Sequence, residues 1–528
     1  MSRTPALRPL QLDISRVELD AHGVRDFVWP VSRAEAAELG DATLLSALRH
    51  GRVAGEADEL AASLGLLATF VVTEVMALYE ATALLERLRR LGREPLLPSI
   101  WTVTPAVMEH RLPEPSALLE WLRSGPSLGS GVRRWFRPVR DAGRRVAMWP
   151  PFGMREGDAI VVASSPLVSL HSERIGGRTL ERRHGVWFRP IATISDAPAV
   201  VRAFADGIVE DLDGRFDAND VVFGEFERAW LRTWILDVGS AALEQVQRAR
   251  AHPRLPKELW TGTGGHPWSR LLRFVTQLDG GTVVGHDHGT GSGMRITPAS
   301  ITSELEACDT YITFNPAQAA EIARHAHPEL LLGKVPRVEH LASGEPVPRS
   351  PVIGEGRGGN RVMILTTLYR GDRYHQASVV ADLVAVDLQA RLYAQLRSWG
   401  YEVILKPHPG SQVAPPAAFV DDLGVRILHG PFEQLIDEAD LLLILDDSNS
   451  TVIRSALATD KPVTILDVYR LPWSDDMRSL LERRCSIVGT TIDEDNRVQV
   501  PWSDLRQALE ESWERRSDRA VFETWFSA

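Results

Sequence analysis

Cysteine is nearly absent from this chain of 528 residues. Cys308 and Cys485 are too few for a disulfide framework, and no group of cysteine and histidine has the spacing of a zinc site. We therefore expect a reduced, cytoplasmic setting and no bound metal ion.

Lysine is also scarce, because almost all basic residues are arginine; the lysines are Lys257, Lys334, Lys406 and Lys461. Two of them fall in the segments 403–410 and 441–467, which carry the strongest site signals. Lysine is a compact point charge that often binds phosphate. A phosphate-binding role is one interpretation of this placement, and chance is the other.

Long hydrophobic runs are few. Met1 to Asp13 lacks the long apolar segment of a secretory signal. The most apolar stretch, Leu64 to Leu85, is interrupted by Glu74 and Glu80, and we expect a buried helix rather than a membrane span. Peripheral contact with the inner face of the cell membrane stays open as an alternative.

Size and charge exclude further classes. The formal net charge of -11 argues against nucleic acid as a partner. A hydrophobic fraction of 44% and a charged fraction of 24% are typical of a soluble globular protein. A chain of 528 residues is too long for one core, so two or three domains are expected. No Walker A, Gly-x-Ser-x-Gly or Gly-x-Gly-x-x-Gly pattern follows a predicted strand.

The pattern along the chain predicts an N-terminal domain over 1–345, a C-terminal domain over 355–500 and a tail over 501–528. A Pro/Gly-rich linker, 342–360, separates the domains. We expect the tail to be an amphipathic helix that packs back on the N-terminal domain.

The N-terminal half is predicted to begin with extra helical segments. Residues 1–60 indicate polar loops with short helical pieces, and a strand is expected over Pro98 to Val103. Two helices, 200–209 and 225–250, are expected on either side of a turn with Asp211 and Asp213, whose spacing resembles a cation-binding pair.

Strands and helices alternate from Leu259 onward and again from Arg361 onward. Short apolar strands alternating with helices are typical of doubly wound parallel sheets. In such sheets, ligands bind outside the carboxyl ends of the strands. Polar turns at those ends are therefore the candidate sites.

The first candidate turn in the C-terminal domain contains Lys406, His408 and Pro409. Prolines on both sides of the histidine restrict the backbone, so the turn can hold an imidazole and an ammonium in place. His408 could donate to a phosphate or ribose while Lys406 neutralises charge. The alternative is a rigid corner with an incidental histidine.

The second candidate turn lies between a strand over 441–445 and a helix over 451–459, and its phosphate-binding candidates are Ser448, Ser450 and Thr451. Helix N-terminal amides bind anions, and hydroxyls add donors. Simple helix capping is the alternative, and Asp446 and Asp447 count against a nearby anion.

In the N-terminal domain the segment 285–293 is rich in glycine and contains His286, Asp287 and His288. Glycine lets the backbone approach a ligand closely, and these side chains could act as a general base or bind a sugar. Metal ligation and an ordinary turn are the alternatives. The Gly-rich loop 261–268 is expected to line the same cleft; His171 and Arg370 belong to weaker candidate segments.

A predicted strand leads into Lys-Pro-His-Pro, and a later strand leads into Asp-x-Ser-x-Ser-Thr, a helix and Lys-Pro-Val. This order of motifs resembles the C-terminal half of GT-B glycosyltransferases of bacterial surface polysaccharides. The nearest groups are capsule Kdo transferases, sialyltransferases and CDP-glycerol glycerophosphotransferases. The resemblance implies two Rossmann-like domains facing a cleft. It also implies that Lys406, His408 and Pro409 bind the nucleotide, and that Ser448, Ser450 and Thr451 bind the phosphate. His288 followed by glycine resembles a Gln-His-Gly loop, although Asp287 replaces the glutamine.

From this resemblance we expect a glycosyltransferase that uses a nucleotide-sugar donor, with a CMP-sugar favoured, and no other cofactor. The acceptor would be a glycan or lipid-linked glycan, and Asp287 or His288 would be the catalytic base. If the configuration is retained, a carboxylate nucleophile is needed instead. The alternatives are a nucleotide-sugar epimerase of the same fold and a catalytically inert glycan-binding protein.

Overall fold

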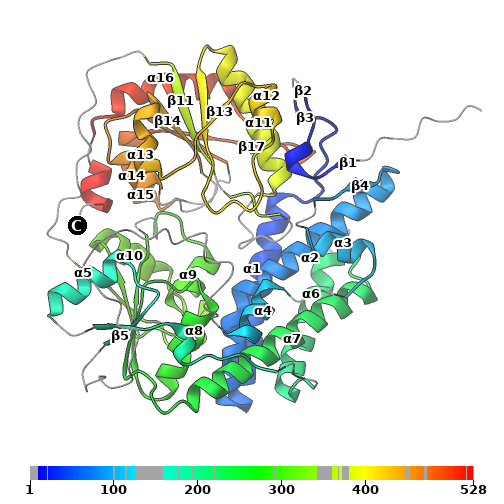
Figure 1. The fold of residues 1–528 in the computed structure, drawn as a ribbon, viewed down its shortest axis with the longest axis vertical. Helices are drawn as coiled ribbons and strands as arrows, with labels where there is room; N and C mark the ends of the chain where they lie inside the picture. Colours follow the sequence, from blue (N-terminus) through cyan, green and yellow to red (C-terminus); the bar gives the residue numbers. More distant parts are fainter. Residues whose placement is uncertain are drawn as a thin grey trace, which may run out of the picture.

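Two six-stranded sheets, both made only of parallel strands, form the framework of the protein and lie one above the other in Figure 1. The computed structural model describes residues 10–20, 22–98, 101–112, 116–125, 159–176, 179–192, 194, 196–217, 221–289, 293–341, 359–366, 368–371, 380–446, 452–468, 473–518 and 520–526. The predicted α/β class is confirmed, with two Rossmann-like parallel sheets flanked by helices.

The N-terminal sheet has the strand order β10-β9-β8-β7-β5-β6. Numbered along the chain and read from β6, this order is 2-1-3-4-5-6, so the winding direction changes between β5 and β7. Its strands are β5 (Ala159–Val162), β6 (Thr179–Glu181), β7 (Glu258–Thr261), β8 (Thr282–His286), β9 (Thr310–Thr313) and β10 (Arg337–His340). The intervening helices are α5 (Pro166–Ile175), α8 (Pro267–Leu278), α9 (Pro298–Leu305) and α10 (Pro316–His325), with the short 3-10 turns η4 (His184–Val186) and η5 (Pro328–Leu330).

The C-terminal sheet has the strand order β13-β12-β11-β14-β15-β16, which is 3-2-1-4-5-6 along the chain. The winding direction changes between β11 and β14, and a ligand crevice is expected there. The strands are β11 (Arg361–Leu365), β12 (Glu402–Lys406), β13 (Arg426–Ile427), β14 (Leu441–Asp446), β15 (Val463–Asp467) and β16 (Ser486–Gly489). The helices between them are α11 (Asp382–Ser398), α12 (Ala418–Asp421), α13 (Phe432–Leu435) with η6 (Ile436–Glu438), α14 (Val452–Leu457) and α15 (Asp475–Arg484).

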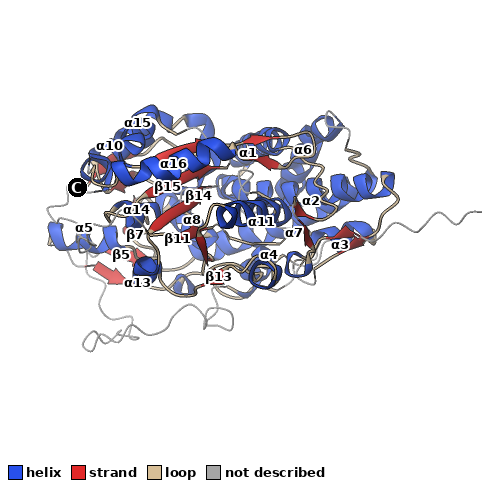
Figure 2. Ribbon diagram, turned by 90° about the horizontal axis from the view of Figure 1, so that it is seen from above, coloured by secondary structure: helices blue, strands red, loops and turns tan. Residues whose placement is uncertain are grey.

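Helices cover both faces of the C-terminal sheet, as the view from above shows (Figure 2). One face packs on α11 and on α16 (Trp502–Arg515), and the opposite face packs on α13, α14 and α15. Side chains of β11, β12 and β14 alternate between the two hydrophobic clusters, which explains why these strands are apolar along their whole length.

A layer of long helices packs beside the N-terminal sheet (Figure 1). It comprises α1 (Arg33–Ala57), η2 (Glu59–Leu67), α2 (Ala68–Arg90), α3 (Val103–Met108), α4 (Ala117–Ser124), α6 (Ala199–Asp217) and α7 (Glu225–Arg250). A capping box of Ser32 and Glu35 starts α1. A side chain at Gly51 would meet the backbone of Gly65 at 2.6 Å, so glycine allows α1 and η2 to approach closely.

Among the residues that the structure describes, one helical stretch, Glu59–Arg90, is long and apolar enough to cross a membrane, but 78% of its most apolar window is buried inside the protein. The predicted buried helix is therefore present, and burial by neighbouring helices accounts for its apolar composition. Glu74 and Glu80 are themselves buried within it.

The segment from Leu10 to Trp29 packs in the hydrophobic core of the C-terminal half, although the sequence predicted it to belong to the N-terminal domain. It contains β1 (Leu10–Gln11), η1 (Ile14–Arg16), β2 (Leu19–Asp20) and β3 (Gly23–Val24). The backbone amide of Val24 donates to Asp387 on α11 at 3.0 Å, and β1 pairs with β4 (Pro95–Leu96). From Leu10 onward, the described chain therefore lies first on the C-terminal half and crosses to the N-terminal half before α1.

Three expectations for the N-terminal half were wrong. Residues 33–57 form one helix rather than short pieces, because its turns pack on η2, α2 and α6. Val103 begins α3 instead of ending a strand. Asp211 and Asp213 lie inside α6, where Asp211 accepts from Ser46 at 2.5 Å and pairs with Arg49, while Asp213 pairs with Arg228. Their carboxylates are thus used in contacts between helices.

The tail divides between the two halves. Helix α16 packs on β15 and β16 of the C-terminal sheet, whereas the last turn, η7 (Phe522–Phe526), contacts α10 of the N-terminal half and α14. Asn315 donates from its side-chain amide to the carbonyl of Trp525. A small antiparallel pair, β17 (Thr491–Ile492) and β18 (Val498–Gln499), follows β16.

A buried ion pair joins the two halves at the carboxyl ends of their sheets. Arg295, in the chain between β8 and α9, donates to Asp467, the last residue of β15, at 3.1 Å, and both side chains are almost fully buried. The guanidinium lies 3.6 Å from the ring centroid of Trp473, whose indole N–H donates to the same carboxylate at 3.3 Å.

We expect Asp467→Asn to lower the free energy of unfolding by about 3–5 kcal/mol, because it leaves the Arg295 charge buried without its counter-ion. Denaturant unfolding would measure the loss, with Asp206→Asn in an exposed pair with Arg232 as the matched control, expected to cost less than about 1 kcal/mol. Replacing both partners, by Arg295→Met and Asp467→Leu, should recover most of the loss. An equal cost for the buried and exposed variants would contradict this account.

Candidate functional site

The carboxyl ends of the two sheets meet at one boundary, and the Arg295–Asp467 pair lies there. Backbone contacts reinforce the junction, because the amide of Ser474 donates to the carbonyl of Met294 at 3.3 Å. The polar turns predicted from the sequence follow strands of both sheets at these carboxyl ends. They therefore belong to the boundary where the two halves face each other.

In the C-terminal half, Lys406 ends β12 and is buried, with its ammonium donating to the carbonyl of Pro407 at 3.1 Å. Burial lowers the pKa of Lys406, and the charge of Glu433 opposes that shift. The following His408 and Pro409 are exposed. This turn thus holds a shielded positive charge directly behind an exposed imidazole.

The imidazole of His408 is oriented by its own turn. Its Nδ1 accepts from the backbone amide of Gly410 at 3.0 Å. Partial burial, Lys406 and Arg370 lower the pKa of His408 to about 4, so the ring is neutral at pH 7. A neutral ring that accepts at Nδ1 carries its proton at Nε2. His408 is therefore a hydrogen-bond donor toward solvent, as required for a phosphate or ribose oxygen.

The loop after β11 lies beside this turn, next to the change of winding direction. The amide of Tyr369 donates to Ser411 at 3.2 Å, and the amide of Gln412 donates to the carbonyl of Tyr369 at 2.8 Å. Asp382 accepts from the amides of Arg370 and Gly371, which orders the loop. Arg370, a weaker candidate from the sequence, contributes to lowering the pKa of His408 through its positive charge.

Two further groups of this half were missed by sequence reasoning. Thr366, one residue beyond β11, is buried and its hydroxyl has no hydrogen-bond partner in the described part of the chain. Arg454, in the first turn of α14, is half-buried, and burial lowers its pKa. The predicted phosphate-binding residues Ser448, Ser450 and Thr451 lie outside the described residues.

In the N-terminal half, the two predicted catalytic residues have different environments. Asp287 is fully buried, and its carboxylate accepts from Gln318 at 2.5 Å and from the amide of Gly289 at 3.1 Å. His288 is exposed and lies 3.6 Å from a carboxylate oxygen of Glu304. Asp287 thus holds the loop in place, whereas His288 is the group that a ligand can reach.

Glu304, on α9, links the two predicted loops. Its other carboxylate oxygen accepts from the backbone amide of Gly264 at 3.0 Å, so the glycine-rich loop after β7 and the histidine after β8 share one carboxylate. Burial and the charge of Arg270 lower the pKa of the nearby His266; the charge of Glu304 opposes this shift and that of His288 adds to it. No sequence signal marked Glu304, because its role depends on where α9 packs.

The base of these loops is a network of buried polar groups. Arg273 donates to Thr261 at 2.7 Å and to the carbonyl of Glu304 at 2.9 Å, and Arg270 donates to the carbonyl of Gly264 at 2.6 Å. Both guanidiniums are buried. The loops therefore rest on a rigid support rather than on mobile backbone.

In the N-terminal sheet the winding direction changes between β5 and β7, and the carboxyl ends of these two strands lie side by side. The amide of Gly262 donates to the carbonyl of Ala163 at 2.9 Å, and a side chain at position 262 would overlap that carbonyl. Ala163 itself has φ of 50°, a left-handed conformation that is uncommon for alanine. Such strain often lies at functional sites.

A histidine pair lies at the end of β8. His171 on α5 is stacked on Trp260 with ring centroids 4.3 Å apart, and its Nδ1 lies 2.9 Å from Nε2 of His286. Because Nδ1 of His286 lies 3.3 Å from the carbonyl of Thr261, it must be the protonated nitrogen. The proton between the rings then belongs to His171, whose Nε2 keeps a lone pair. Burial lowers the pKa of both rings, to about 3 for His286.

In the described ranges, no group of three or more His, Cys, Asp or Glu side chains is arranged to hold a metal ion. A scan against protein-family models finds no match for the chain. A search of the curated proteins also finds no match.

Buried neutral histidines predict acid lability. The pKa of His286 is about 3 in the folded protein and 6.5 when exposed, so the unfolded chain binds more protons below pH 6.5 and stability falls as the pH falls. His286 alone should account for about 2 kcal/mol between pH 7 and pH 5. Denaturant unfolding at several pH values would show this slope, and His286→Gln should flatten it while the exposed control His327→Gln should not. An unchanged slope in His286→Gln would contradict the assignment.

Proposed function

We propose that the protein is a glycosyltransferase of GT-B type, which transfers a sugar from a nucleotide-activated donor to a bacterial surface glycan. One observation carries the proposal: two parallel sheets meet at their carboxyl ends, and each contributes a polar cluster to that boundary. Donor and acceptor binding on opposite sides of such a boundary is the arrangement that transfer requires.

The donor side is assigned to the C-terminal half. His408 presents an N–H donor, and Lys406 and Arg370 supply positive charge close to it. These groups suit the phosphate and ribose of a nucleotide, and they would stabilise the negative charge of the leaving group. A CMP-linked sugar is favoured through the resemblance of the Lys-Pro-His-Pro turn.

The acceptor side is assigned to the N-terminal half. His288 is the proposed general base, because it is exposed and its Nδ1 lies 3.6 Å from a carboxylate oxygen of Glu304, which can orient the ring. Asp287 is proposed as a positioning residue, since its carboxylate is buried against Gln318. The acceptor would be a glycan or lipid-linked glycan at the inner face of the cell membrane.

A nucleotide-sugar epimerase is the second candidate. The histidine pair His171 and His286 favours it, since an epimerase needs proton-transferring groups near one sugar. His286 is fully buried, however, so the exposed His288 cluster supports transfer better. Product analysis without an added acceptor distinguishes the two, because only an epimerase converts the donor sugar alone.

Nucleotide binding provides the first test. Calorimetric titration with CMP, CDP, UDP and GDP should show preferential binding of a cytidine nucleotide, and His408→Ala should weaken that binding at least about tenfold through the lost hydrogen bond and ordering of the turn. The matched control is His429→Ala, because His429 is an exposed histidine after β13; this variant should bind the nucleotide normally. Absence of binding by all four nucleotides would rule out the donor site.

Catalysis provides a separate test. With the CMP-sugar selected by binding, His288→Gln should slow CMP release in the presence of acceptor by about 10²–10⁴-fold, because a general base is lost, while CMP affinity stays unchanged. His327→Gln is the control in the same half. Asp287→Asn should lower the melting temperature as well as the rate. A normal rate in His288→Gln would remove this residue from the mechanism.

A further inference from the structure

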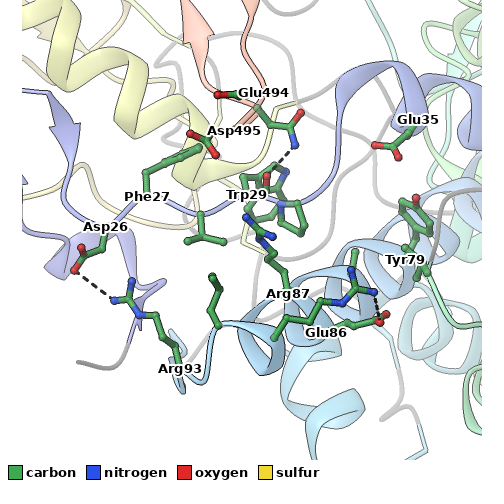
Figure 3. Close-up of a pocket in the computed structure, with 17 residues that line it drawn as sticks. Asp26, Phe27, Trp29, Glu35, Tyr79, Glu86, Arg87, Arg93, Glu494 and Asp495 are labelled. Carbon is green, nitrogen blue, oxygen red and sulfur yellow. Dashed lines mark hydrogen bonds and ion pairs between the residues drawn. The ribbon is translucent and has the colours of Figure 1, made fainter. Parts of the chain in front are cut away.

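A cavity of about 660 Å³ lies away from the strand ends, where the chain crosses between the two halves (Figure 3). Most of its wall comes from the crossing segment Asp26–Pro30, from α2 and the residues just after it, and from the turn between β17 and β18, and Glu35 and Val221 complete the lining. Glu35, in the first turn of α1, lines the cavity, and Arg33 two residues earlier donates to the carbonyl of Val468 beyond β15 at 3.5 Å. The proposed donor and acceptor clusters do not use this cavity.

Aromatic side chains form the apolar part of the wall. Phe27 is half-buried, and the guanidinium of Arg497 lies 4.7 Å from its ring centroid. Trp29 and Tyr79 are buried and contribute to the lining (Figure 3). Aromatic rings bordering a polar cavity are suited to ligands that have both an apolar face and hydroxyl groups.

The polar groups of the wall fall into two classes. Arg90 pairs with Glu86 at 2.6 Å and Arg93 pairs with Asp26 at 3.4 Å, so their charges are compensated (Figure 3). Arg87, by contrast, has no side-chain hydrogen bond or ion pair with any described residue, although its side chain lines the cavity. It therefore offers donors to a ligand.

The opposite wall supplies acceptors. Glu494 and Asp495 are exposed at the tip of the turn, and neither carboxylate is paired within the described residues. The turn is rigid, because Asp493 accepts from the amides of Asp495 and Arg497 at 3.0 Å and 2.9 Å. Asn496, with φ of 62°, donates from its side chain to the carbonyl of Trp29 at 2.9 Å and so ties the turn to the crossing segment.

We propose that this cavity binds a neutral oligosaccharide. The apolar face of a sugar ring would contact Phe27, its hydroxyl groups would donate to Glu494 and Asp495, and its oxygens would accept from Arg87. Among the described residues, Arg87 faces the unpaired carboxylates of Glu494 and Asp495. The wall also holds Glu35, whose carboxylate accepts from the backbone amide of the N-cap residue of α1. This excess of carboxylate suits a neutral polyol better than an anion, which the carboxylates would repel. This oligosaccharide site is separate from the proposed transferase site. Only its role, holding the growing acceptor chain, rests on the proposed transferase function.

An array of neutral, acidic and amine-bearing oligosaccharides, followed by calorimetry on the ligands that bind, tests the proposal with the full-length protein. A neutral oligosaccharide should bind, and Arg87→Ala, Phe27→Leu and Asp495→Ala should each weaken binding at least about fivefold. Arg89→Ala is the matched control, because Arg89 is exposed on the same helix but does not line the cavity. Equal melting temperatures for Arg87→Ala and Arg89→Ala would show that the loss is not a folding defect.

Several results would overturn the proposal. The first is that no neutral oligosaccharide on the array binds, and the second is that Arg87→Ala and Arg89→Ala bind with equal affinity. The third is that spermine binds more tightly than any saccharide, which would identify a cation pocket. His408→Ala separates this site from the proposed function, since it should weaken nucleotide binding and leave saccharide binding intact. If the wild-type protein binds saccharide but no nucleotide, the cavity proposal stands and the transferase proposal fails.

Discussion

The buried ion pair of Arg295 and Asp467 is the contact on which the arrangement of the two halves depends. Removing two charges from water is costly, and the cost is offset only when their geometry is well satisfied. Trp473 contributes to that geometry, by covering the guanidinium and donating to the carboxylate. Because a displaced partner would leave a buried charge unpaired, the pair favours one relative position of the two sheets. The carboxyl ends are held facing each other in that position.

Buried polar groups perform a similar task within each half. Arg273 and Asp287 hold the loops after β7 and β8, and Asp382 holds the loop after β11. Each of these side chains is buried and uses its hydrogen bonds on the protein itself. The exposed groups, His288 and His408, are then presented from rigid loops. Such pre-organisation lowers the entropic cost of binding a ligand.

The sequence predicted those elements whose pattern is set locally. The helix 225–250 was predicted with the bounds that the structure has, because apolar periodicity marks it. The helix over residues 33–57 was predicted only as short helical pieces among polar loops, whereas close packing between helices accounts for its glycines at 51 and 55. Tertiary contacts, which no local pattern contains, decided that region.

Site residues divide in the same way. Lys406, His408 and His288 could be found because they follow apolar strands directly, and strand ends are where ligands bind in such sheets. Glu304 could not be found, because it lies on a helix and meets His288 and Gly264 only after α9 has packed. The cavity beside Arg87 was missed for the same reason, since it joins segments more than four hundred residues apart.

The crossing segment before α1 connects these separate places. On one side Trp29 borders the cavity and is tied to the β17–β18 turn by Asn496, and on the other side Arg33 reaches the strand end that bears Asp467. Val24, two residues before the segment, donates from its backbone amide to Asp387 on α11. The segment is therefore held at both ends by the C-terminal half while it leads into the helices of the N-terminal half. Any movement of one half against the other must displace this segment, so the cavity and the boundary between the sheets share one mechanical element.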